Sequence, residues 1–236
     1  MPIHARLALL LTLLACLLPA QLPAQTTATK APDTYLGRRI ATTMHYSGAP
    51  WLVRESRQRE EDCRRLLKQL NVQPGQTLCD MGCGNGFYTL ALARLAGTEG
   101  KVYAVDIQPE MLEMLEKSAR ESGIENVHPV LGTQTDPKLP EESIDLLLLV
   151  DVYHELSHPE EMLQAIRKSL KPAGRIALAE FRAEDPKVPI KPLHKMSKKQ
   201  ILKEYTANGL KLAGEFDELP WQHVMYFERD ESEQAP

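Results

Sequence analysis

Seven residues, from Asp80 to Gly86, have the types and the spacing to hold a ligand. They read Asp-Met-Gly-Cys-Gly-Asn-Gly and place glycines at positions 82, 84 and 86. A short apolar stretch, residues 77–80, leads into them, and a helical pattern over residues 87–96 follows. A strand, a glycine-rich turn and a helix bring backbone N–H groups and a helix N-terminus against a bound group. The segment therefore predicts a ligand-binding corner.

Asp80 indicates which ligand this corner favours. Its carboxylate stands two residues before the first glycine, where it would repel a pyrophosphate and attract a cationic amine. The glycines are spaced G-x-G-x-G, whereas the dinucleotide fingerprint is G-x-G-x-x-G. S-adenosylmethionine carries an ammonium on its methionine end and a sulfonium sulfur. The residues therefore favour this cofactor over a dinucleotide.

A second carboxylate, Asp106, ends the next predicted strand, residues 101–106, twenty residues after Gly86. From there it can accept hydrogen bonds from both hydroxyls of a ribose. NAD and S-adenosylmethionine both contain a ribose, so Asp106 alone does not separate them. The alternative is a loop aspartate that caps the helix beginning at Pro109. Together with the glycine turn, Asp106 predicts a ribose contact.

Strands and helices alternate along the chain, which predicts an α/β fold with a Rossmann-like, mostly parallel seven-stranded sheet and helices on both faces. Parallel strands are expected at residues 77–80, 101–106, 127–131, 144–150 and 175–181, and helices at 55–70, 87–96, 109–122, 159–170 and 197–208. Residues 211–218 and 222–228 predict a C-terminal antiparallel hairpin. Ligands bind beyond the carboxyl ends of such strands, so Asp80, Asp106 and Asp151 are expected at one edge.

Residues 55–70 precede the first strand of this sheet and can cover the mouth of a ligand site. In that arrangement Trp51, Tyr46 and Arg57 face a substrate. The alternative places Trp51 on the core and the arginines in solvent. The sequence leaves both arrangements open.

From about residue 73 to residue 181, the chain resembles the class I S-adenosylmethionine-dependent methyltransferases. The family's first motif, an apolar residue, an acid and alternating glycines, stands at residues 78–86, and the final hairpin fits the family's extra antiparallel strand. The resemblance implies that Asp80, with the turn of Gly82, Cys83 and Gly84, holds the methionine moiety. It also implies that Asp106 holds the ribose and that Ile107 flanks the adenine.

Two further family positions are less regular. The motif after the fourth strand stands as Asp151-Val152-Tyr153-His154-Glu155, and the resemblance places it near the methyl group and the substrate. Family members often have an acid just after the third strand that binds the adenine amino group. Here Thr133 or Asp136 could serve, and the sequence does not choose between them.

Methyl transfer is an in-line displacement that requires alignment of donor and acceptor and exclusion of water. A base is needed only when the acceptor carries a proton, and His154 and His194 are the candidates, ahead of Glu155. The alternative for His154 is a bond to the backbone at a helix start, and for His194 a place in a solvated loop. Tyr153 could offer its ring or its hydroxyl to the sulfonium methyl.

The composition limits the kinds of molecule that the protein is expected to bind. The net charge is −4 and no basic stripe is present, so a nucleic acid is not expected and a small-molecule acceptor is. Past the N-terminal segment three cysteines remain, Cys63, Cys79 and Cys83. An odd number argues against a disulfide framework, and no partners stand at metal spacing, so no metal site is predicted. The alternatives to a methyltransferase are a nicotinamide-dependent oxidoreductase and a non-catalytic cofactor-binding protein.

Residues 1–24 predict a signal peptide, because Arg6 precedes an apolar run over residues 7–18 and small residues follow it. A lipoprotein anchored at Cys16 is a weaker alternative. Residues 25–50 are expected as a linker and N-terminal segment, 51–230 as the methyltransferase domain, and 231–236 as a disordered tail. The protein is therefore expected to be exported, periplasmic or secreted, with no stable membrane span in the mature chain. The leader and the arginines after Trp51 resemble exported bacterial members of the type 11-like group.

Overall fold

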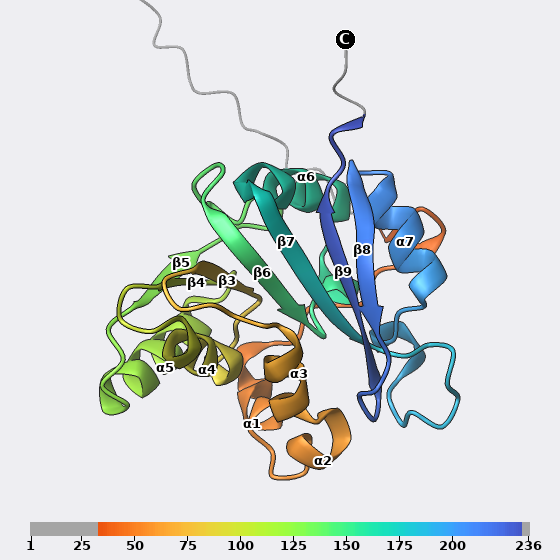
Figure 1. Ribbon diagram of the computed structural model, residues 1–236. Coiled ribbons are helices and arrows are strands. Elements are labelled where there is room, and N and C mark those ends of the chain that lie inside the picture. The colour runs from red at the N-terminus through yellow and green to blue at the C-terminus, as the bar shows by residue number, and fades with distance from the viewer. Residues whose placement is uncertain (1–32, 233–236) are drawn as a thin grey trace, which may run out of the picture. The chain divides into compact units, whose positions relative to one another are not determined.

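The computed structural model describes residues 33–232. The predicted signal peptide with Cys16, residues 25–32 of the predicted linker and the last four residues lie outside this range. The described residues form a seven-stranded sheet in the order β5-β4-β3-β6-β7-β9-β8 (Figure 1). This confirms the predicted mostly parallel sheet with antiparallel strands at its C-terminal end.

The sheet reverses its winding direction between β3 and β6. The parallel strands are β3 (Thr77–Met81), β4 (Lys101–Asp106), β5 (Val127–Leu131), β6 (Ile144–Val150) and β7 (Leu170–Phe181). The chain steps outward from β3 to β4 and β5, then returns to place β6 on the other side of β3. Such a switch point leaves a crevice at the carboxyl ends of the strands. The last two strands, β8 (Leu210–Phe216) and β9 (Gln222–Arg229), are antiparallel to each other.

Helices cover both faces of this sheet, as predicted (Figure 1). On one face α3 (Cys63–Gln69), α4 (Phe87–Ala96) and α5 (Pro109–Glu121) pack, and on the other α6 (Pro159–Ser169) and α7 (Lys198–Thr206). In β6, Leu146 and Leu148 face the first layer, whereas Leu147 and Leu149 face the second. Successive strand residues point to opposite faces, so a strand buried on both faces has a continuous apolar run.

The segment before β3 differs from the prediction. It contains a small hairpin of β1 (Thr34–Tyr35) and β2 (Arg38–Arg39), then η1 (Tyr46–Gly48), α1 (Ala49–Leu52) and α2 (Arg57–Glu61). The single helix expected over residues 55–70 is wrong. Asp62 adopts a left-handed conformation with φ 49° and its side chain accepts a hydrogen bond from the Arg65 N–H, so it ends α2 and caps α3.

Residues 33–50 form an N-terminal segment that is tied to the sheet and to α7. The Ala41 N–H donates to the His154 carbonyl at 3.0 Å, and the Arg38 guanidinium forms an ion pair with Glu204 at 2.7 Å. Helix α1 lies against the glycine turn that follows β3, where the Asn85 side chain donates to the Ala49 carbonyl at 3.3 Å. The N-terminal segment thus covers the edge at which a ligand is expected.

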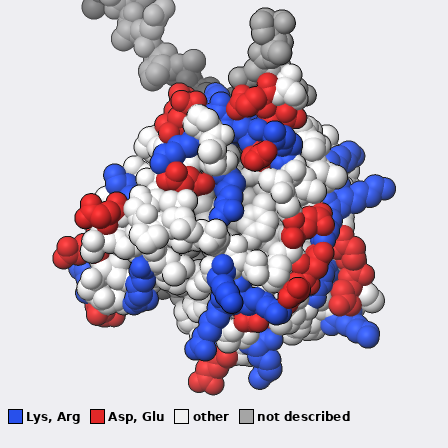
Figure 2. All heavy atoms as spheres, viewed as in Figure 1, with Lys and Arg blue, Asp and Glu red and all other residues white. Residues whose placement is uncertain are grey.

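The surface carries charges of both signs. Figure 2 shows Lys and Arg side chains interspersed with Asp and Glu on this face of the molecule, without a continuous basic stripe across it. Within residues 33–232, no helix is both long and apolar enough to cross a membrane.

Candidate active site

A cavity of about 450 Å³ opens at the carboxyl ends of the parallel strands. Its walls come from the ends of β3, β4 and β6, from the N-terminal segment with α1 and α2, and from residues 189–194 of the loop after β7. Cavities of roughly 300–1,000 Å³ are typical of small-molecule sites. The switch point of the sheet therefore carries a site large enough for a cofactor and an acceptor group.

The glycine turn forms one wall of the cavity. Gly82 and Gly84 have φ angles of 69° and 53°, a backbone conformation that costs little only for glycine. A Cβ atom on Gly84 would lie 2.5 Å from Cδ1 of Leu52 in α1. The N–H groups of Gly82 and Cys83 donate to the Val105 carbonyl at 2.8 and 2.9 Å. The turn is thus tied to β4 and closely covered by α1.

Asp80 lies buried beside this turn, with 4% of its surface exposed. The Thr89 hydroxyl, one turn into α4, donates to its Oδ2 at 2.6 Å. Burial raises the pKa of Asp80 to about 6, although the Thr89 hydrogen bond and the charge of Arg57 oppose the rise. A buried carboxylate of this kind favours a cationic partner.

Asp106 faces the cavity from the end of β4. Its Oδ2 accepts from the Gly84 N–H at 3.0 Å and its Oδ1 from the Gln108 N–H at 2.9 Å. Burial raises its pKa, whereas these backbone hydrogen bonds lower it. Each carboxylate oxygen retains a lone pair, because an ionised carboxylate has about four acceptor positions. Asp106 can therefore bind two ribose hydroxyls, and Ile107 lines the cavity next to it.

Asp151 is the third carboxylate of the edge. It has a left-handed backbone, with φ 53°, and the Gln222 side chain donates to its Oδ2 at 2.7 Å. Its Oδ1 is buried and receives no hydrogen bond from the described residues. Burial raises the pKa of Asp151 well above its usual value, and the charge of Glu61 adds to the rise. An unsatisfied acceptor in the wall of a cavity is available to a ligand.

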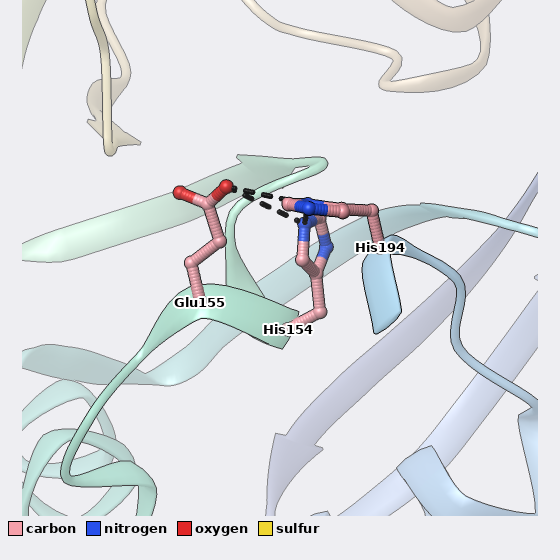
Figure 3. A group of neighbouring side chains, drawn as sticks. All are labelled: His154, Glu155 and His194. Carbon is pink, nitrogen blue, oxygen red and sulfur yellow. Dashed lines mark hydrogen bonds and ion pairs between the residues drawn. The ribbon is translucent and has the colours of Figure 1, made fainter. Parts of the chain in front are cut away.

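Three side chains converge on another part of the wall, and we call them the His154 cluster: His154, Glu155 and His194 (Figure 3). His154 Nε2 lies 3.1 Å from His194 Nδ1. Glu155 Oε1 lies 3.7 Å from the first of these nitrogens and 3.5 Å from the second. η2 (Tyr153–Glu155) and η3 (Pro192–His194) supply these residues. The structure thus joins both histidines that the sequence singled out.

Glu180 is fully buried at the end of β7 and contacts His154 of this cluster. Its Oε2 lies 2.7 Å from His154 Nδ1. Burial lowers the pKa of His154, but the Glu180 and Glu155 carboxylates outweigh burial and raise this pKa to about 10. Burial and the nearby charge of His154 lower the pKa of His194. The cluster is therefore a polar region, with carboxylates on two sides of His154, in a largely apolar cavity.

Trp51 and Arg57 both line the cavity. Trp51 is 49% exposed, and the Arg54 guanidinium lies 3.8 Å from its ring centroid. Arg57 is 5% exposed and forms an ion pair with Glu61 at 2.7 Å. The alternative of a core tryptophan and solvated arginines is therefore wrong for these two residues.

The placement of Tyr153 at the methyl group is wrong. Its side chain is fully buried and its hydroxyl donates to Glu204 Oε2 at 2.6 Å, on the α7 side of the sheet. The reason lies in the 3₁₀ turn of η2, where successive side chains point about 120° apart. His154 and Glu155 face the cavity, whereas Tyr153 enters the core.

Two other expected contacts also lie elsewhere. Tyr46 does not line the cavity; its ring packs on His45 with centroids 4.2 Å apart, and Thr43 and Met44 line the cavity instead. Asp136 turns away, because its Oδ1 accepts from the Lys138 N–H at 2.7 Å. Of the two candidates after β5, only Thr133 reaches the cavity.

The sequence prediction missed Thr89, Glu61 and Glu180. Glu180 gave a usable signal, because an acid inside the apolar run of a central strand requires a buried partner. Glu61 gave none, since it stands in a densely charged segment that reads as a solvated helix face.

The chain is similar to known methyltransferases in sequence and in structure. Residues 73–230 match the family model described as a methyltransferase domain. The chain is similar to a demethylmenaquinone methyltransferase of Geobacillus stearothermophilus, 29% identical over 109 residues, which is 46% of this chain and 47% of the relative. It is also similar to the ubiquinone/menaquinone biosynthesis C-methyltransferase UbiE of Vibrio vulnificus, 31% identical over 123 residues, 50% of this chain and 47% of the relative. The chain thus spans about half the length of these curated relatives.

Among solved structures, a SAM dependent methyltransferase from Aquifex aeolicus is similar, with a TM-score of 0.74 and 25% identity, covering 78% of this chain and 98% of that one. The [4+2]-cyclase SpnF shares the fold at 16% identity and a TM-score of 0.60, covering 70% of this chain and 80% of that one. The fold alone therefore does not specify the reaction. Because the family model covers most of the chain, and because the carboxylates and glycine turn of its motif line one cavity, the chain belongs to the methyltransferase domain family, in its S-adenosylmethionine-dependent class.

Proposed function

We propose that the protein transfers a methyl group from S-adenosylmethionine to a small molecule with an apolar body. The observation that carries the proposal is the single cavity in which Asp80 and the glycine turn lie together with the His154 cluster. Asp80 and the glycine turn suit a cationic methionine end, and the His154 cluster offers polar groups to an acceptor. A cofactor side and an acceptor side within one cavity are what an in-line transfer requires.

On the cofactor side, the residues present fit the cofactor. Asp80 and the unsatisfied Oδ1 of Asp151 can accept hydrogen bonds from an ammonium group. Asp106 can hold the ribose, with Ile107 and Thr133 beside the adenine. When bound, S-adenosylmethionine supplies an electrophilic methyl group on its sulfonium. The family assignment does not support the nicotinamide-dependent alternative.

Apolar side chains make up most of the lining of the cavity. Trp51 and Phe87 are large apolar residues that line the cavity and remain partly exposed, and Leu193 is exposed next to His194. Exposed apolar surface around a cavity is typical of a binding site. The curated relatives are named for quinone methylation, which supports an acceptor with an apolar ring. Of the lysine and arginine side chains in the described loop after β7, only Lys191 lines the cavity.

We expect the His154 cluster to activate the acceptor. His194 is the more exposed histidine and His154 the buried one that Glu180 orients. The test is release of S-adenosylhomocysteine by the full chain with a panel of phenols, quinols and thiols. His194→Ala should lower kcat by about 100-fold, the usual contribution of a general acid–base group, and leave the S-adenosylmethionine Kd unchanged.

His128→Ala is the matched control, because His128 lies on the exposed side of β5 outside the cavity. Full activity of His194→Ala with the panel member that the wild type methylates would contradict the role of the cluster. Cofactor binding without turnover across the whole panel would favour a non-catalytic binding protein.

We also propose that residues 1–24 direct export and that the protein belongs to the exported, type 11-like bacterial group. Arg6 and the apolar run over residues 7–18 support this proposal. S-adenosylmethionine is made in the cytoplasm, so export would require a cofactor supply outside it. N-terminal sequencing of the natural protein is expected to find processing between Ala20 and Ala28. An intact Met1 in the soluble cytosolic fraction would refute export, and a lipid on Cys16 would show a lipoprotein instead.

A further inference from the structure

The geometry points to a divalent transition-metal site, of the Zn²⁺ type, formed by His154 Nε2, His194 Nδ1 and Glu155 Oε1 on the acceptor side of the cavity. The inference deepens the proposed function, because it assigns the His154 cluster a ligand of its own. Metal binding does not depend on methyl transfer, however, and can be measured without it.

The distances between the three donor atoms suit one metal ion. They are 3.1 Å between the two nitrogens, and 3.7 and 3.5 Å from these nitrogens to the glutamate oxygen. Metal–ligand bonds of about 2.0–2.1 Å in tetrahedral geometry separate ligand atoms by about 3.3 Å. A cation can therefore contact all three atoms after side-chain adjustments of a few tenths of an ångström. Figure 3 shows the three side chains gathered around a common point.

Glu180 provides the outer partner that metal-bound histidines usually have. Its carboxylate lies 2.7 Å from His154 Nδ1 and is fully buried. A carboxylate at this nitrogen fixes the ring orientation and the tautomer that leaves Nε2 as the metal ligand. The Glu155 and Glu180 carboxylates also place two formal negative charges beside the two imidazoles, which attract a bound cation.

The chemistry of the donor set limits the class of metal. Two imidazoles and one carboxylate are the protein ligands of one type of catalytic zinc site, in which the remaining position takes water or substrate, and also of non-haem iron(II) sites. All three residues line the cavity, so the remaining position is expected to face the acceptor. An oxygen, nitrogen or sulfur donor of the acceptor could bind there and lose its proton to solvent more readily.

The test uses the full chain without a histidine tag, stripped with a chelator and titrated with ZnCl₂ by calorimetry at pH 7.5. The wild type is expected to bind one equivalent of Zn²⁺, and Co²⁺ at the same site should give the visible absorption of a four-coordinate ion. The three described cysteines are buried and are not expected to compete. Lack of a stoichiometric site in the wild type would overturn the inference.

Variants locate the bound ion. His194→Ala and Glu155→Gln should each weaken Zn²⁺ binding by at least tenfold, and Glu180→Gln by about 10–100-fold through the outer partner. His128→Ala, outside the cavity, should bind as the wild type does. Binding that His194→Ala and Glu155→Gln leave unchanged would place the ion elsewhere and overturn the inference.

Titration with S-adenosylhomocysteine separates the two proposals. Each variant should bind it as the wild type does, which shows that the variant is folded. Zn²⁺ binding without turnover would count against the proposed function alone. Turnover by chelator-treated protein that binds no Zn²⁺ would count against the metal site alone.

Discussion

Asp80 is buried beside the glycine turn, where its carboxylate accepts a hydrogen bond from the neutral Thr89 hydroxyl. Its pKa rises from 3.8 to about 6, mainly because of burial. The folded protein therefore holds this proton more tightly than the unfolded chain. The stability that protonated Asp80 contributes is lost as the pH rises from about 4 to about 6. Above about pH 6 the buried, ionised carboxylate lowers the free energy of unfolding by about 3 kcal/mol.

Asp80→Asn should therefore stabilise the cofactor-free protein. At pH 7.5 the free energy of unfolding is expected to rise by roughly 1–3 kcal/mol, because no buried charge remains. The gain should shrink toward pH 4, where Asp80 of the wild type is protonated. Urea unfolding at both pH values measures it, with Glu99→Gln, at an exposed position, as the control. An equal gain at pH 4 and pH 7.5 would contradict the linkage.

The same titration should govern cofactor affinity. Asp80 is faced by Thr89 of α4, Arg57 of α2 and Asp106 of β4, and it must be ionised to pair with an ammonium group. The Kd for S-adenosylmethionine should be constant above about pH 7. Below about pH 6 it should rise toward tenfold per pH unit. Calorimetry between pH 5 and pH 8 tests this, and a Kd that stays flat to pH 5 would contradict it.

At the scale of elements, α1 is seated on the glycine turn. Gly84→Ala tests this contact, because the added Cβ would lie 2.5 Å from Cδ1 of Leu52. Gly123→Ala is the matched control, since Gly123 has a φ of 62°, close to the 53° of Gly84, and an added Cβ would contact nothing within 4 Å. The variant at Gly84 should lose about 0.5–1.5 kcal/mol more stability than the control, because the Leu52 side chain must leave its preferred rotamer.

A second substitution separates the clash from backbone strain. Leu52→Ala combined with Gly84→Ala should recover much of the excess loss, because the clashing atom is removed. Thermal or urea unfolding of the three variants measures the difference. Equal losses at Gly84 and Gly123 would mean that α1 does not rest on the turn.

The N-terminal segment is anchored to α7 by Arg38. Its guanidinium bonds both oxygens of the fully buried Glu204, at 2.7 and 2.9 Å, and also the His154 carbonyl. Arg38→Ala should cost about 3–5 kcal/mol, because a buried carboxylate loses its cation. The neighbouring Arg39→Ala, at an exposed position, should change the free energy of unfolding by less than about 0.5 kcal/mol. Similar losses in the two variants would contradict the anchor.

The sequence allowed the sheet, and the carboxylates and glycine turn that line the cavity, to be predicted because their signals are local. Asp80, the glycines and Asp106 belong to two adjacent strand–turn–helix units, in which each motif is contiguous. The His154 cluster joins His154 with His194, 40 residues apart, and the N-terminal anchor joins residues 166 apart. Such contacts depend on how loops cross the sheet edge, and residue spacing does not encode that. The sequence also did not predict the break between α2 and α3 at Asp62, because the charge pattern of residues 55–70 fits a continuous helix as well as two short ones.

At the scale of the whole molecule, the topology places carboxylates at or just after the ends of three different strands in one crevice. The switch between β3 and β6 brings the ends of β3, β4 and β6 together, and the N-terminal segment covers them (Figure 1). A cyclase shares this architecture, so the reaction follows from the side chains in the cavity and not from the fold. The proposed binding of S-adenosylmethionine depends most on the Asp80 side chain and on the backbone of the glycine turn.

The most direct test is calorimetric titration of the full chain with S-adenosylmethionine at pH 7.5, beside NAD and beside the Asp80→Asn variant. One equivalent of S-adenosylmethionine should bind to the wild type, at least tenfold more weakly to the variant, and NAD should give no heat. Binding of NAD in place of S-adenosylmethionine, or equal S-adenosylmethionine affinity in wild type and Asp80→Asn, would contradict the account.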